Sequence, residues 1–393
     1  MRNIPYGRQD ISAGDIDAVI NVLRSDWLTQ GPVVPQFENA ITEYCGANFA
    51  IAVNSATSAL HIGCLSLGLG PGDWLWTSPI SFVASANCGL YCGARVDFID
   101  IDPLTYNVSM GALEEKLRIA KKNGALPKVV VPVHFAGQSC DMRRVRQLAD
   151  EYNFKIIEDA SHAIGARYQN EPVGNCRYSD ITVFSFHPVK IITTGEGGVA
   201  VTNDAKLASR MQILRSHGIT RNSSAMLSQN VGPWYYEQIE LGFNYRMTDI
   251  QAALGLSQLH RLDKFVDARQ SIAKKYNIAL ASLPVTIPWQ DPDSYSSFHL
   301  YVIRLKTDAI KKTRLEVFES MRALGVGVNV HYIPIYHQPF FKNRHGFDIG
   351  YCPNAEAYYR EAISLPMYPS LVDADFDYVV ASLRQALGIK YQS

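Results

Sequence analysis

Between residues 49 and 157, short apolar runs alternate with amphipathic segments, and this alternation restricts the possible folds more than any other feature of the chain. Apolar strands that alternate with helices are typical of a mainly parallel sheet covered on both faces. We therefore predict the α/β class. The runs predict strands at 49–53, 75–77, 96–99, 129–133 and 155–157, and the segments between them predict helices at 57–67, 82–91, 111–122 and 142–152.

The remaining elements indicate two domains. A long helical pattern over 250–283 is expected to bridge to a smaller α+β domain, because the composition changes beyond Pro284. We predict an N-terminal arm and large domain over 1–258, and the bridging helix with a small C-terminal domain over 259–393. Further helices are expected at 10–24, 34–44, 312–324, 353–362 and 374–387, and further strands at 181–186, 198–202, 298–305 and 327–330.

Charge and composition argue against several classes of partner. The 393 residues are 47 % hydrophobic, enough for a large core, and 37 basic residues balance 37 acidic ones. Without a long run of one sign, the chain has no electrostatic basis for binding nucleic acid or an anionic membrane. The first residues lack the apolar run of a signal peptide, and no segment approaches an uninterrupted membrane span. We expect a cytoplasmic protein whose partners are small molecules.

Metal, disulfide and nucleotide motifs are also missing from the sequence. The seven cysteines are irregularly spaced, and Cys88 and Cys92 have no second pair nearby, so we expect buried free thiols and no metal site. The histidines lack ligand spacing, and most are expected to be structural. No glycine-rich dinucleotide fingerprint or phosphate loop occurs, which disfavours nicotinamide and nucleoside triphosphate chemistry.

Lys190 is the first candidate for chemistry. It lies between an apolar strand and a glycine-rich return into the next strand, within Ser-Phe-His-Pro-Val-Lys-Ile-Ile-Thr-Thr-Gly-Glu-Gly-Gly. Partial burial at a strand end would lower the pKa of its ammonium group and leave free amine, which is what a nucleophile toward carbonyl groups requires. The alternative is an ordinary surface lysine in a loop.

Other candidates follow strands, where ligands bind in parallel sheets. Asn54-Ser55-Ala56-Thr57-Ser58 opens a helix with three hydroxyl residues, which indicates a phosphate site or simple N-capping. Asp159 follows the strand 155–157 and could keep the nitrogen of a pyridine ring protonated, as in pyridoxal phosphate, for which Lys190 would supply the aldehyde linkage. Capping of the next turn is the alternative for Asp159, and Glu158 is expected to face the opposite side.

Two further positions are weaker candidates. Phe82, at a helix start, could stack on a flat cofactor ring or belong to the core. In the turn Gly-Phe-Asn-Tyr-Arg-Met-Thr-Asp, Arg246 could bind a carboxylate or diphosphate with two parallel hydrogen bonds, and Asn244 could donate to a phosphate. Surface capping would explain the same turn.

In combination, these motifs resemble one family. Asn-Ser-Ala-Thr-Ser-Ala-Leu (54–60), Glu-Asp-Ala-Ser-His-Ala (158–163), Ser-Phe-His-Pro-Val-Lys (185–190) and Thr-Thr-Gly-Glu-Gly-Gly (193–198) resemble the DegT/DnrJ/EryC1/StrS family of pyridoxal-phosphate enzymes, and the likeness runs from Tyr6 almost to the C-terminus. It implies the fold type I of pyridoxal-phosphate-dependent transferases, which is aspartate aminotransferase-like, and a homodimer with shared active sites.

The resemblance also implies residue roles. Lys190 would bind the cofactor's aldehyde covalently, Asp159 would pair with the pyridine nitrogen, and His162 would lie beside the ring or its hydroxyl. Asn244 would reach the phosphate in the partner subunit. The remaining cofactor contacts would be Ala56, where many relatives carry glycine, Thr57, Ser58, Phe82 and Ser185, and the substrate contacts would be Tyr6, Asp26, Trp27, Leu28, Thr29, Arg246, His331 and Tyr332.

The implied reaction is a transamination in two halves. L-glutamate would transfer its amino group to the cofactor, giving pyridoxamine 5'-phosphate, with Lys190 moving the proton. A nucleotide-linked keto-sugar would then receive this amino group. Arg-Ser-His-Gly (215–218), Gly-Leu-Ser-Gln-Leu (255–259) and Val-His-Tyr-Ile-Pro-Ile-Tyr (330–336) resemble the branch that aminates C4 of a UDP-linked 4-keto-6-deoxy-N-acetylhexosamine, giving UDP-4-amino-4,6-dideoxy-N-acetyl-β-L-altrosamine.

Three alternatives stay open. Another UDP- or dTDP-linked keto-sugar could be the acceptor. Dehydratases of the same family carry histidine where Lys190 stands, so the lysine disfavours that reaction. A non-catalytic binding or regulatory relative is disfavoured by the presence of both Lys190 and Asp159. The role of His187, three residues before the lysine, is not assigned.

Overall fold

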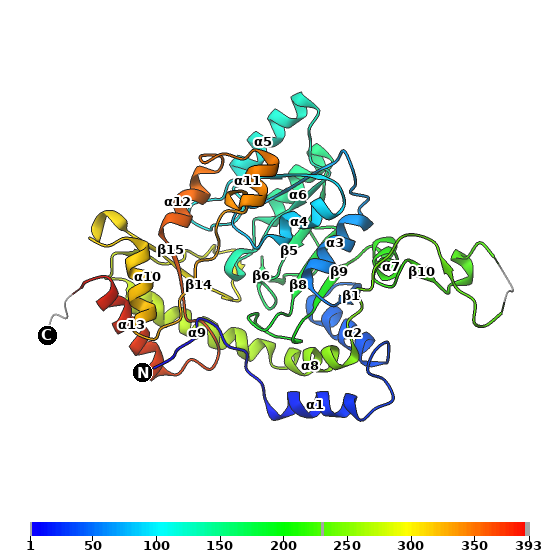
Figure 1. Cartoon of the computed structure of the whole chain (residues 1–393), viewed down its shortest axis with the longest axis horizontal. Helices are drawn as coiled ribbons and strands as arrows, with labels where there is room; N and C mark the ends of the chain where they lie inside the picture. The colour runs from blue at the N-terminus through cyan, green and yellow to red at the C-terminus, as the bar shows by residue number, and fades with distance from the viewer. Residues whose placement is uncertain (1, 229–231, 390–393) are drawn as a thin grey trace.

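The computed structural model describes residues 2–228 and 232–389, and a seven-stranded sheet lies at its centre (Figure 1). In this sheet β9 runs opposite to the other six strands, which all run in one direction, so the prediction of a mainly parallel sheet is confirmed. The strand order is β1 (Phe49–Val53), β9 (Gly198–Thr202), β8 (Ile181–Ser185), β5 (Lys155–Asp159), β4 (Val129–Val131), β2 (Trp74–Thr77) and β3 (Arg95–Phe98).

Alternate side chains of the central strands point to opposite faces of the sheet, and each face is covered. Val129, Val131 and Ile157 pack in one apolar cluster, whereas Val130 and Ile156 pack in another. The first face is covered by α3 (Ala56–Ser66), α4 (Ala84–Tyr91) and α7 (Ala205–Leu214), and the second by α2 (Val33–Cys45), α5 (Met110–Asn123), α6 (Met142–Tyr152) and α8 (Asp249–Leu259).

The C-terminal part has its own sheet and core. Its strands pair in the order β12 (Val285–Thr286), β14 (Tyr301–Leu305) and β15 (Ala362–Leu365). The N-terminal segment joins this core, because the Ile4 amide donates to the Gly325 carbonyl at 2.9 Å and Ile4 is buried. The helices around it are α9 (Leu262–Leu280), α10 (Arg314–Ala323), α11 (Pro339–His345), α12 (Pro353–Glu361) and α13 (Asp373–Ala386).

Two predicted elements were wrong. The helix expected over 250–283 is two helices, because the chain turns at Arg261, whose φ of −109° and ψ of 3° are not helical. The Arg261 guanidinium instead binds Asp10 and Asp15, which hold α1 (Ala13–Leu23) against α8. The strand expected over 327–330 is reduced to an isolated bridge between Asn329 and Ser364, because the residues before it hydrogen-bond to the N-terminal segment.

The segment that carries β10 (Ile219–Thr220) and β11 (Glu237–Gln238) projects away from the rest of the molecule (Figure 1). A third small sheet joins β13 (Ser294–Tyr295), β6 (Arg167–Tyr168) and β7 (Glu171–Pro172).

All seven cysteines are free and buried, as predicted. Within residues 2–228 and 232–389, no helix is long and apolar enough to cross a bilayer. The division into domains after residue 258 stays a prediction.

Candidate active site

A cavity of about 450 Å³ opens where the carboxyl ends of β5 and β8 meet the first turn of α3. This is the edge of the sheet where ligands are expected in doubly wound folds. The cavity brings together ten of the predicted site residues from the two ends and the middle of the chain. They are Tyr6, Ala56, Thr57, Phe82, Asp159, His162, Ser185, Lys190, His331 and Tyr332.

Lys190 lies on the cavity wall in the loop that follows β8, half-buried. Desolvation lowers the pKa of its ammonium group to about 8, although the charge of Asp159 acts in the opposite direction. No hydrogen bond or salt bridge engages the Lys190 ammonium among the described residues. A fraction of the Lys190 side chains is therefore free amine near neutral pH.

Asp159 ends β5, is 4 % exposed, and also lines the cavity. Its Oδ1 accepts from the Ser161 amide at 3.1 Å, and its Oδ2 accepts from the Ser85 hydroxyl at 2.6 Å. The neighbouring Glu158 faces the other side of the strand, where its Oε2 lies 2.6 Å from His134 Nε2, so that expectation is confirmed. Asp159 is thus the carboxylate of β5 that faces the cavity.

The first turn of α3 supplies hydrogen-bond donors to the cavity. Ser55 caps the helix and accepts from the Ser58 amide, while no described residue accepts from the amides of Ala56 and Thr57. Two free amides at a helix N-terminus favour an anion such as phosphate. Gly198 permits this arrangement, because a Cβ there would lie 2.4 Å from the Ala56 nitrogen.

One predicted phosphate ligand does not face the cavity. The Ser58 hydroxyl donates to Asn54 Oδ1 at 2.6 Å and is not part of the lining. Ser55, one of the three hydroxyl residues at this helix start but not among the predicted phosphate ligands, lines the cavity in its place. Ser185, at the end of β8, also lines the cavity and is 8 % exposed.

Neutral imidazoles form the wall around the lysine. His162 Nδ1 accepts from the Ala136 amide at 3.3 Å, so the ring proton is assigned to Nε2, which lies 3.1 Å from the Tyr332 hydroxyl. Burial, Lys190 and His331 together hold the pKa of His162 well below its usual value. Burial followed by Lys190 likewise lowers the pKa of His331 to about 3. These rings add no positive charge that would compete with an anionic ligand.

Tertiary packing alone brings the last groups into the site. Tyr6 reaches the cavity because the strand-like segment around Ile4 pairs with residues 325–327. The centre of the Tyr6 ring lies 5.5 Å from that of the His331 ring. His299 also lines the cavity, with its ring 4.4 Å from that of His162, and was not among the predicted site residues. Its position depends on Gly137, whose φ of +104° and lack of Cβ admit the 297–298 segment. No local sequence signal marked it.

His187 and Glu196 lie at the rim. Both line the cavity, and His187 Nε2 is 3.9 Å from Glu196 Oε1, with both side chains about half exposed. The His187 Nδ1 accepts from the Val189 amide at 3.3 Å, which fixes the turn that leads to Lys190. Phe82 is 60 % exposed on the same rim, as a ring that is to stack on a ligand would be.

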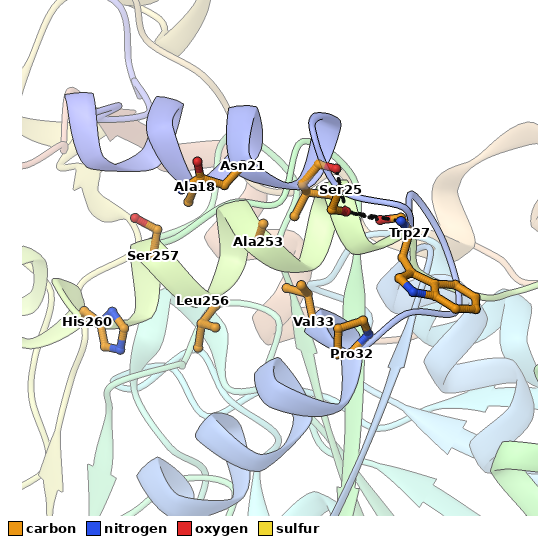
Figure 2. A pocket seen from close by; sticks show the side chains of 11 residues that line it. Ala18, Asn21, Ser25, Trp27, Pro32, Val33, Ala253, Leu256, Ser257 and His260 are labelled. Atoms are coloured by element: carbon orange, nitrogen blue, oxygen red, sulfur yellow. Dashed lines mark hydrogen bonds between the residues drawn. The ribbon is translucent and has the colours of Figure 1, made fainter.

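The other predicted contacts do not line this cavity. They are Asn244, Arg246 and the loop 26–29. The Asn244 carbonyl lies 3.5 Å from Asn54 Nδ2, next to the start of α3, whereas the loop 26–29 lies at the start of α8, where the Asp249 amide donates to the Leu28 carbonyl at 3.0 Å. Trp27 lines a separate cavity between α1, α2 and α8, with its indole at one end (Figure 2). The predicted site residues are therefore divided between the lining of the first cavity and positions outside it.

The lining fits pyridoxal 5'-phosphate. It offers an amine with a lowered pKa for the aldehyde, a buried carboxylate for the pyridine nitrogen, and free helix amides with Ser55, Thr57 and Ser185 for the phosphate. When bound, this cofactor acts as an electron sink for the carbanion formed at a substrate carbon. In the described part of the chain, no group of three or more His, Cys, Asp and Glu is placed to hold a metal ion.

Comparisons with known proteins agree with this geometry. The DegT/DnrJ/EryC1/StrS aminotransferase family matches residues 9–384. A UDP-4-amino-4,6-dideoxy-N-acetyl-beta-L-altrosamine transaminase from Campylobacter jejuni is 39 % identical over 380 residues, which cover 95 % of each chain. Among solved structures, Helicobacter pylori PseC, an aminotransferase involved in the biosynthesis of pseudoaminic acid, matches with a TM-score of 0.89 and 32 % identity over 98 % of this chain and 100 % of PseC.

A further solved structure bears on the cofactor. The putative sugar aminotransferase Spr1654 from Streptococcus pneumoniae, in its PLP-form, matches with a TM-score of 0.88 and 30 % identity over 98 % of this chain and 99 % of that one. The predicted family, fold type and enzyme class are confirmed. The chain belongs to the DegT/DnrJ/EryC1/StrS family and is a pyridoxal-phosphate-dependent sugar aminotransferase.

Proposed function

We propose that this enzyme transfers the amino group of L-glutamate to C4 of a UDP-linked 4-keto-6-deoxy-N-acetylhexosamine, giving UDP-4-amino-4,6-dideoxy-N-acetyl-β-L-altrosamine for pseudaminic acid biosynthesis. The observation that carries the proposal is that Lys190 and Asp159 line the same cavity. The chain that holds them is 39 % identical to a transaminase named for this sugar. The likeness to PseC over nearly the whole chain supports the same choice of acceptor.

In this proposal the chain's own residues have distinct tasks. Lys190 Nζ takes the proton from the α-carbon of glutamate in the first half-reaction and returns a proton to C4 of the sugar in the second. Asp159 holds the proton on the pyridine nitrogen, and the first turn of α3 holds the phosphate. The atoms balance over the two halves, because one water supplies the keto oxygen of 2-oxoglutarate and the carbonyl oxygen of the sugar leaves as another, so no net water is formed or consumed.

The acceptor is tested by incubating the purified enzyme with glutamate and UDP- and dTDP-linked 4-keto-6-deoxy sugars. We expect amination of the UDP-linked N-acetylated L-sugar, with the product identified by NMR and 2-oxoglutarate formed in equal amount. Turnover of only another sugar would exclude this substrate and leave the aminotransferase class intact. A nucleotide sugar other than this one is the second candidate, because an identity of 39 % leaves room for a different pocket.

We further propose a homodimer whose sites are shared. The support is that the exposed Asn244 and the exposed loop 26–29 are both absent from the cavity lining of their own chain. Placed against a second copy, Asn244 would donate to the phosphate in the partner's cavity and complete its set of ligands. A side chain that served its own site would be expected among the cavity-lining residues.

Mixing two inactive variants tests this arrangement. Lys190→Ala and Asn244→Ala subunits, unfolded and refolded together, are expected to recover up to about one quarter of wild-type activity, because each hybrid dimer regains one intact site. Each variant refolded alone serves as the control. If Asn244 acted within its own subunit, both sites of every hybrid would be defective and no activity would return. An active species that sediments as a monomer would also contradict the proposal.

A further inference from the structure

A chain of hydroxyl groups runs from the cavity to the carboxylate of Asp159. Ser81 Oγ lies 2.7 Å from Ser85 Oγ, and Ser85 Oγ lies 2.6 Å from Asp159 Oδ2. Ser81 lines the cavity and is 5 % exposed, whereas Ser85, in the first turn of α4, is fully buried. Ser81 lies three residues before α4 begins, in the turn that leads into the helix. Neither serine was among the predicted site residues.

The direction of these hydrogen bonds follows from proton counting. An ionised carboxylate can only accept, so the single hydroxyl proton of Ser85 points to Asp159 Oδ2. The alternative acceptor, the Phe82 carbonyl, is more distant at 3.3 Å. Ser85 must then accept from Ser81. On the other carboxylate oxygen the Ser161 amide donates at 3.1 Å, so both oxygens of Asp159 are held by donors.

Because Asp159 is buried, its charge depends on the two hydrogen-bond donors, the Ser85 hydroxyl and the Ser161 amide. Asp159 is 4 % exposed and has no salt bridge among the described residues, so hydrogen bonds must replace the water that an ionised carboxylate loses. Hydrogen bonds to charged groups stabilise the charge more strongly than hydrogen bonds between neutral groups. The same two donors fix the plane of the carboxylate, and a fixed plane is what alignment with a ring nitrogen requires.

We propose that Ser85, supported by Ser81, is a positioning residue of the transamination, which keeps Asp159 ionised and oriented toward the pyridine nitrogen of the cofactor. The proposal rests on the cofactor-binding part of the proposed function and not on the identity of the sugar. Without the Ser85 hydroxyl, the ionised carboxylate loses its shortest hydrogen bond, and the proton shared with the pyridine nitrogen moves toward Asp159. The cofactor then becomes a weaker electron sink.

The state of the pyridine nitrogen can be measured directly. The wild-type enzyme and variants are loaded with pyridoxal phosphate labelled with ¹⁵N in the ring, and the ¹⁵N chemical shift is followed by NMR. We expect a protonated ring in the wild type and a shift toward the unprotonated position in Ser85→Ala. The glutamate half-reaction, followed by absorbance, is expected to slow about tenfold. Ser81→Ala should show the same changes at smaller size, because it acts through Ser85.

Two further variants separate positioning from packing. Ser85→Cys keeps nearly the same volume but donates weakly, so it should resemble Ser85→Ala in its ¹⁵N shift. Ser66→Ala removes another buried serine hydroxyl, which bonds to the Ile62 carbonyl within α3 at 2.7 Å, and should keep the wild-type shift and rate. Circular dichroism at the assay temperature verifies that each variant is folded.

Three results would overturn the proposal. A wild-type ¹⁵N shift in both Ser85 variants would show that Asp159 does not need this donor. Variants that lose stability but keep the wild-type ¹⁵N shift and rate would show that the serines contribute only to packing. If Ser85→Ala does not fold, a wild-type ¹⁵N shift in both Ser85→Cys and Ser81→Ala would contradict the proposal. Failure of the sugar assignment is recognised separately, since these measurements use only the cofactor and glutamate, and a wild type that takes up no pyridoxal phosphate would refute the proposed function itself.

Discussion

Replacement of Lys190 by alanine is expected to lower kcat for amino transfer on the order of 10⁴-fold, because one change removes both the covalent attachment of the cofactor and the group that moves the proton. Lys190 is the lysine that lines the cavity, and no hydrogen bond or salt bridge within residues 2–228 and 232–389 engages its ammonium. Borohydride reduction of the loaded wild type, followed by mass spectrometry, should place the cofactor on the peptide that contains Lys190.

The pH dependence of cofactor capture gives an independent measure of this lysine. With a pKa of about 8, roughly one-tenth of the Lys190 side chains are free amine at pH 7, against well under a thousandth for an ordinary lysine. Covalent capture should therefore accelerate as the pH rises and level off above pH 8. A rate that still climbs beyond pH 10 would contradict the lowered pKa.

Lys155→Ala is the matched control for the lysine. Its ammonium lies 3.0 Å from Asp180 on the surface at the start of β5, outside the cavity. Surface salt bridges of this kind contribute little to stability, so kcat and the reduced peptide should be those of the wild type. Cofactor found on any lysine other than Lys190, or a Lys190→Ala enzyme of near wild-type activity, would refute the assignment.

Asp159→Asn is expected to lower kcat about 10²- to 10³-fold while the protein stays folded. The amide has the shape of the carboxylate but no charge, so it cannot stabilise a proton on the pyridine nitrogen. Stopped-flow absorbance of the glutamate half-reaction measures the effect without the sugar. The ring-¹⁵N shift of this variant also gives the unprotonated end point against which the Ser85 variants are read.

Asp141→Asn distinguishes this effect from a general loss of carboxylates. Asp141 caps α6, accepts from the Arg144 amide at 3.1 Å, and lies outside the cavity. The expected result is a loss of at most about 1 kcal/mol of stability, typical of a helix cap, with kcat unchanged. An Asp159→Asn enzyme as active as Asp141→Asn would remove Asp159 from the chemistry.

Several parts of the site could be predicted because they depend on local sequence. The hydroxyl-rich start of α3, Asp159 at the end of β5 and Lys190 after β8 each adjoin an apolar strand of the sheet. Parallel strands present their carboxyl ends at one edge, so three separate motifs were expected to converge before any contact was known. Ser58 marks the limit of such inference, since the motif does not say which hydroxyl turns inward.

Errors in the fold arose where long-range contacts override a local pattern. Arg261 stands in an uninterrupted helical pattern, yet its bonds to Asp10 and Asp15 accompany a turn there. Phe298 has the apolar character of a strand, but its φ of +45° bends the chain, and β14 begins only at Tyr301. Arg261 and its two acidic partners lie more than 240 residues apart in the sequence. A local window of residues therefore cannot predict where this helix ends.

By itself, the sequence determined the α/β order of the elements and the places of Lys190 and Asp159 where strands of the sheet end. The tertiary structure alone decided what surrounds them. Tyr6 reaches the cavity through the pairing of Ile4 with 325–327, and His299 lies against His162 because Gly137 leaves room for the approach of the 297–298 segment. The reason is physical: strand ends are set by local periodicity, whereas these contacts come from packing between segments more than a hundred residues apart.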